Sequence, residues 1–171
     1  MQNPPRTSAQ NPPSTSMQNQ PSTSMQIPPD MDALMSRARD AARFSYSPYS
    51  RFPVGAALLC DDGSVVAGAN VENRSFGISN CAERSALFAA VSQGHTRFRA
   101  VAVFCPSADA PVSPCGACRQ ALSEFCPPDT PVCYAGKNGT YVTTTIGGLI
   151  PQDSLHGLKE TAGESGPART H

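Results

Sequence analysis

The feature that most constrains this chain is a set of three cysteines and one glutamate carried by two short segments. Cys81-Ala82-Glu83 places a thiol two residues before a carboxylate, and Pro114-Cys115-Gly116-Ala117-Cys118 places two thiols three residues apart. Three thiolates suit Zn²⁺, and a site with three protein ligands keeps one coordination position for water, whereas a structural site closes with four. Glu83 stands beside the first thiol, where a carboxylate can move the protons of that water. The fold must therefore bring two distant segments together.

Both segments are expected to begin helices. The apolar spacing predicts these helices over residues 81–92 and 115–125. Cys115 and Cys118 then share one face of a first turn, where free N–H groups and the positive end of the helix dipole favour thiolates. Glu83 does not share a regular helix face with Cys81, so these two converge only if the first turn is irregular.

Other interpretations of the cysteines stay open at this point. The Cys-x-x-Cys pair could be a redox dithiol beside an unrelated buried Cys81, and Glu83 could simply serve the helix dipole. A closed structural zinc site would need a fourth thiolate from the remaining cysteines, which are Cys60, Cys105, Cys126 and Cys133. Those four are otherwise expected in the core, because a free cysteine behaves as a small apolar residue.

The remaining patterning indicates an α/β fold. The expected strands cover residues 54–59, 65–70, 100–105, 132–135 and 141–145. Asp32 is expected to cap a first helix, and a short terminal helix is expected over residues 149–158. The order strand, strand, helix, strand, helix, strand, strand is typical of α/β domains. Both cysteine-bearing helices follow a strand, so their first turns should meet at one edge of the sheet, where ligand sites gather.

Composition changes sharply at both ends of the chain. Residues 1–29 carry a decaying eight-residue repeat rich in proline, glutamine and serine, beginning Gln2-Asn3-Pro4-Pro5. Such a segment has almost nothing apolar to bury, so we expect a disordered tail, with a ligand for a proline-binding domain as the alternative. The ordered domain is expected over residues 30–159, followed by a flexible tail over residues 160–171.

Charge and hydropathy exclude several function classes. The formal net charge is zero, and Lys137 and Lys159 are the only lysines, which argues against a nucleic-acid-binding surface. No apolar run approaches the roughly 20 residues that span a membrane, and the first residues lack the apolar core of a secretory leader. With an odd number of cysteines, seven, we expect a cytoplasmic protein with reduced thiols.

Several blocks together resemble the small homo-oligomeric cytidine deaminases, of the cytidine and deoxycytidylate deaminase superfamily. The resemblance runs from about Leu34 to about Pro151. Its blocks are Phe52-Pro53-Val54-Gly55-Ala56-Ala57, Asn70-Val71-Glu72-Asn73, Cys81-Ala82-Glu83-Arg84-Ser85-Ala86 and Ser113-Pro114-Cys115-Gly116-Ala117-Cys118-Arg119-Gln120. A first ligand followed by x-Glu, with Pro-Cys-x-x-Cys later in the chain, is the signature of zinc deaminases. The resemblance implies a three-layer α/β/α fold with a mixed five-stranded sheet, one Zn²⁺ per chain, and a homotetramer with shared active sites.

The resemblance also assigns roles. It implies Cys81, Cys115 and Cys118 as zinc ligands, with Glu83 as the proton shuttle of a zinc-activated water that converts cytidine and 2'-deoxycytidine to the uridines and ammonia. The implied substrate-binding residues are Phe52, which stacks on the pyrimidine, Asn70 and Glu72, which bind the ribose hydroxyls, and Ala82, through its N–H. Arg84 is implied to donate to thiolate sulfur.

Each of the supporting residues also has a structural interpretation. Phe52 could pack in the core, Asn70 and Glu72 could cap a strand end, and Arg84 could be a surface residue paired with a carboxylate. Phe76 precedes Cys81, where the family often has an aromatic residue that reaches a neighbouring subunit.

The C-terminal region departs from the family pattern. After Leu149-Ile150-Pro151 the chain continues Gln152-Asp153-Ser154-Leu155, where the family commonly has a phenylalanine that covers a neighbouring site. Alternatives to cytidine deamination are therefore a different cytosine nucleoside, such as blasticidin S, or a non-catalytic zinc-binding module. A polynucleotide deaminase is disfavoured, because the chain lacks an evident basic channel and a histidine first ligand.

Overall fold

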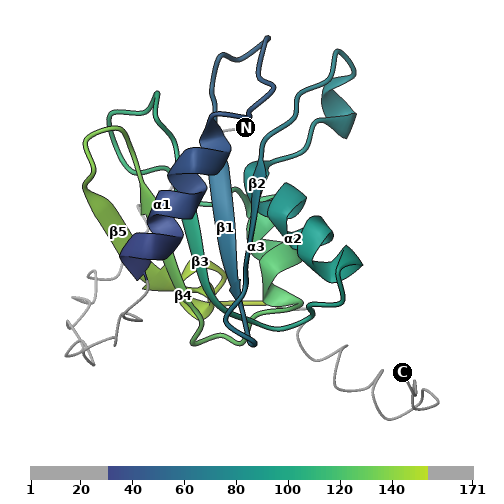
Figure 1. The fold of residues 1–171 in the computed structure, drawn as a ribbon, viewed down its shortest axis with the longest axis vertical. Coiled ribbons are helices and arrows are strands. Elements are labelled where there is room, and N and C mark those ends of the chain that lie inside the picture. Colours follow the sequence, from purple (N-terminus) through teal and green to yellow (C-terminus); the bar gives the residue numbers. More distant parts are fainter. Residues whose placement is uncertain (1–30, 154–171) are drawn as a thin grey trace, which may run out of the picture.

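The computed structural model describes residues 31–153, which form a five-stranded sheet with helices on both faces (Figure 1). The expected tails, residues 1–29 and 160–171, lie outside the described residues. Strand order is β2-β1-β3-β4-β5. The strands are β1 (Gly55–Cys60), β2 (Val65–Ala69), β3 (Phe98–Phe104), β4 (Pro131–Ala135) and β5 (Tyr141–Thr145). Among these strands only the pair β3–β4 is parallel, so the sheet is mixed, as predicted.

The helices make the fold a three-layer sandwich, which confirms the predicted class. One face of the sheet is covered by α1 (Met31–Ala42), and the other by α2 (Ala82–Ser92) and α3 (Gly116–Ser123) (Figure 1). A 3₁₀ turn, η1 (Phe76–Ile78), and a short helix, α4 (Ile146–Leu149), complete the described elements. Each face of the sheet therefore has its own apolar core.

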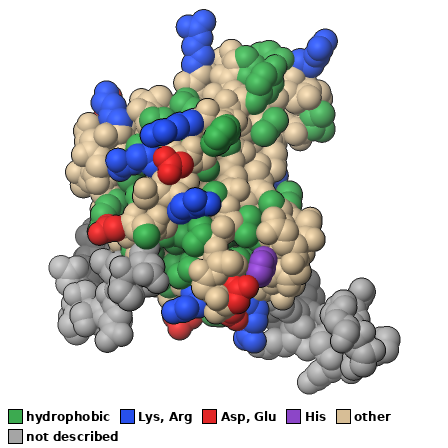
Figure 2. Space-filling model, in the orientation of Figure 1, with side chains coloured by type: hydrophobic (Ala, Val, Ile, Leu, Met, Phe, Trp, Pro, Cys, Tyr) green, Lys and Arg blue, Asp and Glu red, His purple; other side chains and the backbone are tan. Residues whose placement is uncertain are grey.

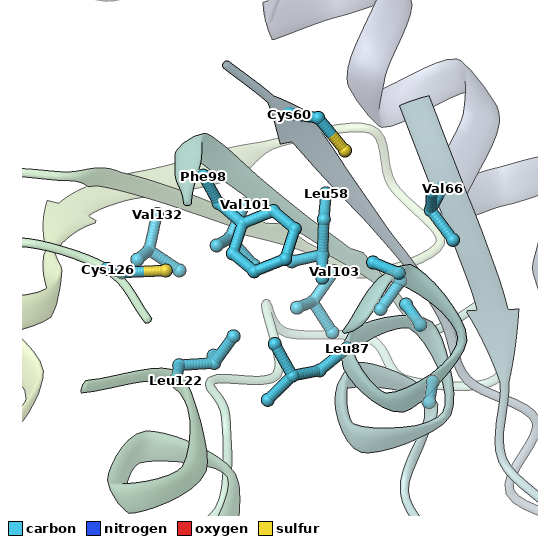
Figure 3. Close-up of a cluster of buried hydrophobic side chains, with 14 of the residues drawn as sticks. Leu58, Cys60, Val66, Leu87, Phe98, Val101, Val103, Leu122, Cys126 and Val132 are labelled. Atoms are coloured by element: carbon cyan, nitrogen blue, oxygen red, sulfur yellow. The ribbon is translucent and has the colours of Figure 1, made fainter. Parts of the chain in front are cut away.

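The strand β1, which lies between β2 and β3, is buried on both faces and serves both cores. Its alternating side chains divide: Ala57 and Leu59 pack under α1, whereas Leu58 and Cys60 face α2 and α3. Figure 3 shows Leu58 in the core between the sheet and the helices α2 and α3, together with side chains of β3, α2 and α3. A strand buried on both sides must be apolar throughout, which explains the unbroken run of small and aliphatic residues here.

Strand directions place α2 and α3 at one end of the sheet. Because β1 is antiparallel to both β2 and β3, those two strands run in the same direction. After β2 the chain leads through η1 to α2, and after β3 it leads to α3. Both helices therefore begin beyond the carboxyl ends of strands that run the same way, and the predicted meeting of their first turns is confirmed.

Most element boundaries differ from the prediction by one or two residues, and three of the differences have a clear physical cause. The first helix begins at Met31, so Asp32 lies inside its first turn instead of capping it. β3 begins at Phe98, before the predicted start at residue 100. The prediction was too late because the exposed Arg99 interrupts the apolar run in the sequence, whereas the strand continues through it. The helix expected over residues 149–158 is wrong in its described part, since α4 ends at Leu149 and Pro151 lies in a turn. Its residues 154–158, which include Leu155, lie outside the described residues.

Within residues 31–153, no helix has both the length and the apolar character that are needed to cross a bilayer.

Two glycines allow the helices to approach the sheet closely. A Cβ on Gly55 would collide with the backbone of α1 at Ala38 and Ala42, and a Cβ on Gly68 would collide with the backbone of α2 at Ala86. Neither collision can be relieved by rotating a side chain, so each added methyl group must displace a helix.

Gly68→Ala should therefore destabilise the protein by about 1–3 kcal/mol, because the methyl group pushes α2 away from β2. Urea unfolding measures the loss. Gly77→Ala is the matched control, because a Cβ at that position meets no atom within 4 Å. Equal stability of the two variants would contradict the close approach of α2 to the sheet.

Candidate active site

The three predicted cysteines meet where α2 and α3 begin. Cys81 and Cys115 are the N-cap residues of these helices, with extended backbone angles, and Cys118 lies in the first turn of α3. The three sulfur atoms lie within 4.8 Å of one another, and the Cys81 and Cys115 sulfurs are 3.9 Å apart. Zn–S bonds of 2.3 Å in a tetrahedron hold sulfurs about 3.8 Å apart. The distance between the Cys81 and Cys115 sulfurs matches this value, and the set as a whole is compact enough to hold a zinc ion.

A fourth thiolate is not part of this group in the described chain, residues 31–153. Cys105, Cys126 and Cys133 are buried, and the thiols of Cys105 and Cys133 lie near the hydroxyls of Ser107 and Thr143. These cysteines occupy the apolar interior, as predicted. The arrangement therefore favours a three-cysteine centre with an open position over a closed structural site.

Neighbouring donors set the charge state of the thiols. The Arg84 guanidinium donates from Nη2 to the Cys81 sulfur at 3.7 Å. Hydrogen bonding from the Cys118 thiol, followed by that from Arg84, lowers the pKa of Cys81 to about 5. The pKa of Cys118 is raised, because its thiol is the donor to Cys81 and is also buried. Arg84 therefore contacts thiolate sulfur, as the sequence predicted, and does not act only as a surface charge.

Glu83 lies in the first turn of α2 and is only 5% exposed. Burial raises the pKa of its carboxyl group, and the charge of the neighbouring Cys81 acts in the same direction. Because Cys81 precedes the helix with extended angles, its side chain and that of Glu83 line the same pocket despite their separation by one residue. A carboxylate that only served the helix dipole would face solvent instead.

Cys81, Glu83 and Cys115 line a pocket of about 470 Å³ together with the predicted substrate contacts. Phe52, Asn70, Glu72 and Ala82 all contribute to its wall. Phe52 is 37% exposed, so it presents part of its ring to the pocket and is not a core residue. The sequence therefore identified residues from four separate segments that the fold brings to one cavity.

Asn70 also fastens the loop between α1 and β1. Its amide oxygen accepts from the Ser45 hydroxyl at 2.6 Å and from the Val54 N–H at 2.8 Å. Its amide nitrogen donates to the Phe52 carbonyl at 2.9 Å. Asn70 therefore holds Phe52 at the pocket wall, a role that the sequence does not suggest.

Glu72 is held by the same loop. Its carboxylate accepts from the Ser50 hydroxyl and from the N–H groups of Tyr49, at 2.9 Å, and Ser50, at 3.2 Å. These donors, the Ser50 hydroxyl foremost, lower the pKa of Glu72. The carboxylate is thus kept charged at the rim of the pocket.

Sequence reasoning missed two supporting side chains, Ser45 and Ser50, and the role of a third, Arg119. Ser45 and Ser50 belong to a stretch whose pattern indicates only the end of a helix.

Arg119 donates to the Pro114 carbonyl at 2.7 Å and to the Leu149 carbonyl at 3.1 Å, which fixes the loop before α3 against α4. Its position one turn after Cys115 was the available signal, since helix residues four apart lie on one face.

Comparisons with known proteins agree with this site. The model of the cytidine and deoxycytidylate deaminase zinc-binding region matches residues 29–134. A cytidine deaminase of Sporosarcina psychrophila is 46% identical over 122 residues, covering 71% of this chain and 89% of that protein. One from Halalkalibacterium halodurans is 49% identical over 122 residues, covering 71% and 92%. The crystal structure of cytidine deaminase from Burkholderia pseudomallei matches with a TM-score of 0.68 and 44% identity, covering 71% of this chain and 96% of that one.

Proposed function

The chain belongs to the cytidine and deoxycytidylate deaminase family, and on that premise we propose that it hydrolyses cytidine and 2'-deoxycytidine to uridine and 2'-deoxyuridine with release of ammonia. One observation carries the proposal: a buried glutamate and two of the three clustered thiols, those of Cys81 and Cys115, line a single pocket that is also lined by the Asn70 amide and the Glu72 carboxylate. That is the arrangement needed to hydrolyse the exocyclic C–N bond of a pyrimidine while its sugar is bound in the same pocket.

Cys81, Cys115 and Cys118 would hold one zinc ion per chain. Zinc bound there would act as a Lewis acid and make a water molecule nucleophilic at neutral pH. Three thiolates leave such a centre with a net charge of minus one, so positive charge must be supplied nearby. The Arg84 guanidinium and the N–H groups at the starts of α2 and α3 supply it.

Glu83 is the proposed proton shuttle. Its buried carboxyl group has a raised pKa, so it holds a proton more readily than an exposed glutamate does. We assign it two proton relays: it accepts a proton from the attacking water and donates it to ring N3, and it then accepts the proton of the hydroxyl group formed on C4 and delivers it to the departing amino group. Hydroxide adds to C4 and the C4–N bond breaks, so the products are uridine and ammonia.

The remaining pocket residues bind the nucleoside. The partly exposed ring of Phe52 offers a surface for stacking on the pyrimidine, and Glu72 offers charged acceptors to the ribose hydroxyls. The Asn70 side chain makes three hydrogen bonds within the protein, two through its oxygen and one through its nitrogen, which leaves its second amide N–H for a hydroxyl. Ala82 also lines the pocket, and its N–H is the proposed contact for the base.

Exposed apolar side chains near the pocket support a homotetramer with shared active sites. Phe76 is 74% exposed, and its ring packs edge-on against Tyr49 at 5.8 Å between ring centres. Tyr46, Val71 and Ile78 are exposed in the same two loops. Apolar side chains gather at that end of the molecule in Figure 2. Surfaces of this kind are usually covered by another protein chain, here a second copy.

The proposed setting is pyrimidine salvage in the cytoplasm. Thiolate ligands persist where the compartment keeps cysteines reduced, and all seven cysteines are unpaired. A free nucleoside is the proposed partner, with neither nucleic acid nor membrane involved, because the chain has no net charge and only two lysines.

Glu83→Gln should lower kcat for cytidine by about 10²–10⁴-fold, because the amide cannot shuttle protons. Zinc content and unfolding midpoint should stay close to those of the wild type, because no zinc ligand is removed. Glu124→Gln is the control, because it makes the same substitution at an exposed residue that does not line the pocket. Undiminished turnover in Glu83→Gln would remove Glu83 from the mechanism.

Glu72→Ala should raise KM for cytidine about 10–100-fold, since a hydrogen bond to a charged group contributes about 1.5–3 kcal/mol. Zinc content should not change. Ser50→Ala is the control: it loosens the loop contact but keeps the carboxylate, so its KM should rise less. Initial rates with cytidine, 2'-deoxycytidine, cytosine and blasticidin S measure both variants. Free cytosine turned over as well as cytidine would contradict the ribose contact.

A further inference from the structure

A second group of metal-ligating side chains lies at the opposite end of α2 from the three-cysteine site. It consists of the Cys60 thiol, the Asp62 carboxylate and the His95 imidazole, whose ligand atoms all lie within 4.8 Å of one another. None of these residues lines the proposed nucleoside pocket. The proposed deaminase chemistry therefore leaves this group without a role.

The β1–β2 hairpin positions the first two ligands. Cys60 is the last residue of β1 and is fully buried, with its side chain in the cluster that faces α2 (Figure 3). Gly63, at a φ of 86°, reverses the chain and donates its N–H to the Cys60 carbonyl at 3.0 Å. The Ser64 N–H and hydroxyl then bind Asp62 Oδ1 at 2.9 and 2.6 Å. Asp62 Oδ1 is thus held by two hydrogen bonds, and Asp62 Oδ2 faces His95.

The end of α2 positions the third ligand. Gly94 has a φ of 94°, which ends the helix in a left-handed residue, and the His95 N–H returns to the Ala90 carbonyl at 3.0 Å. His95 Nδ1 then lies 3.8 Å from Asp62 Oδ2. That separation is too long for a hydrogen bond, but it is close to the roughly 3.4 Å between nitrogen and oxygen on one tetrahedral zinc ion.

The chemistry of the group selects the class of metal. A thiolate, a carboxylate and a neutral imidazole bring two negative charges, which balance a divalent cation. Sulfur and nitrogen ligands suit zinc and related transition metals, whereas calcium and magnesium take oxygen ligands. The Asp62 and His95 side chains are 58% and 25% exposed, so an ion can reach the group from solvent. The nearby Arg97 is paired with Asp61 at 3.9 Å.

We propose that Cys60, Asp62 and His95 form a second binding site for a divalent transition-metal ion, zinc in the first place. The three ligands come from the β1–β2 hairpin and from the segment just after α2. A metal ion there ties the hairpin to the far end of the helix that carries Glu83. Its effect is therefore on stability, and nucleoside turnover does not depend on it.

Zinc content of the full chain tests the proposal. After equilibration with a small excess of free zinc, the wild type should retain two zinc ions per chain, and His95→Gln and Asp62→Asn should each retain one. His156→Gln and Asp61→Asn are matched controls that should retain two. Cytidine turnover should be unchanged in His95→Gln, so a failure of this site is distinguishable from a failure of the proposed function.

Two further readouts separate a built site from adventitious zinc. Zinc beyond the first equivalent should raise Tm of the wild type by about 5–10 °C at a hundredfold excess over Kd, and should not do so in His95→Gln. In the cobalt-substituted protein, His95→Gln should lose about a quarter of the thiolate-to-cobalt absorption, because one of four thiolate bonds is lost. One zinc per wild-type chain, equal loss in His156→Gln, or an unchanged cobalt band would overturn the proposal.

Discussion

The approach of three cysteine sulfurs to within 4.8 Å is the constraint on which the rest of the structure depends. It requires α2 and α3 to begin at the same end of the sheet, which in turn requires β2 and β3 to run in the same direction. The strand β1, which lies between them, provides this by pairing antiparallel with both. Gly68 lets α2 lie directly on the sheet, so the packing of one small residue helps to set the position of the site.

Charge explains the residues around that centre. Three thiolates on a zinc ion would concentrate negative charge, and Arg84 with two helix N-termini would offset it. The burial of Glu83 and the charge of Cys81 raise the pKa of its carboxyl group, which suits the proton shuttle that we propose. Elsewhere in the pocket lining, donors of one loop lower the pKa of Glu72. The two glutamates are thus placed in opposite environments, which fits the different tasks that we propose for them.

Local patterns were predictable from the sequence, and long-range hydrogen bonds were not. The spacing of Cys115 and Cys118 reflects one helical turn, and the strand over residues 141–145 was predicted to the residue. The roles of Ser45 and Ser50 depend on partners 25 and 22 residues away, which no local pattern shows. The terminal helix was misplaced because Thr145 caps an earlier turn, where its hydroxyl accepts from the Gly148 N–H at 3.1 Å.

The most direct measurement is cytidine turnover by protein stripped of metal and then titrated with zinc, with bound zinc determined on the same samples. The change in ultraviolet absorption on conversion to uridine reports the reaction. Turnover should rise with bound zinc and level off at about one zinc per chain, because a site of three thiolates fills before one with a single thiolate. A chain with its three-cysteine site filled that leaves cytidine unchanged would contradict the account.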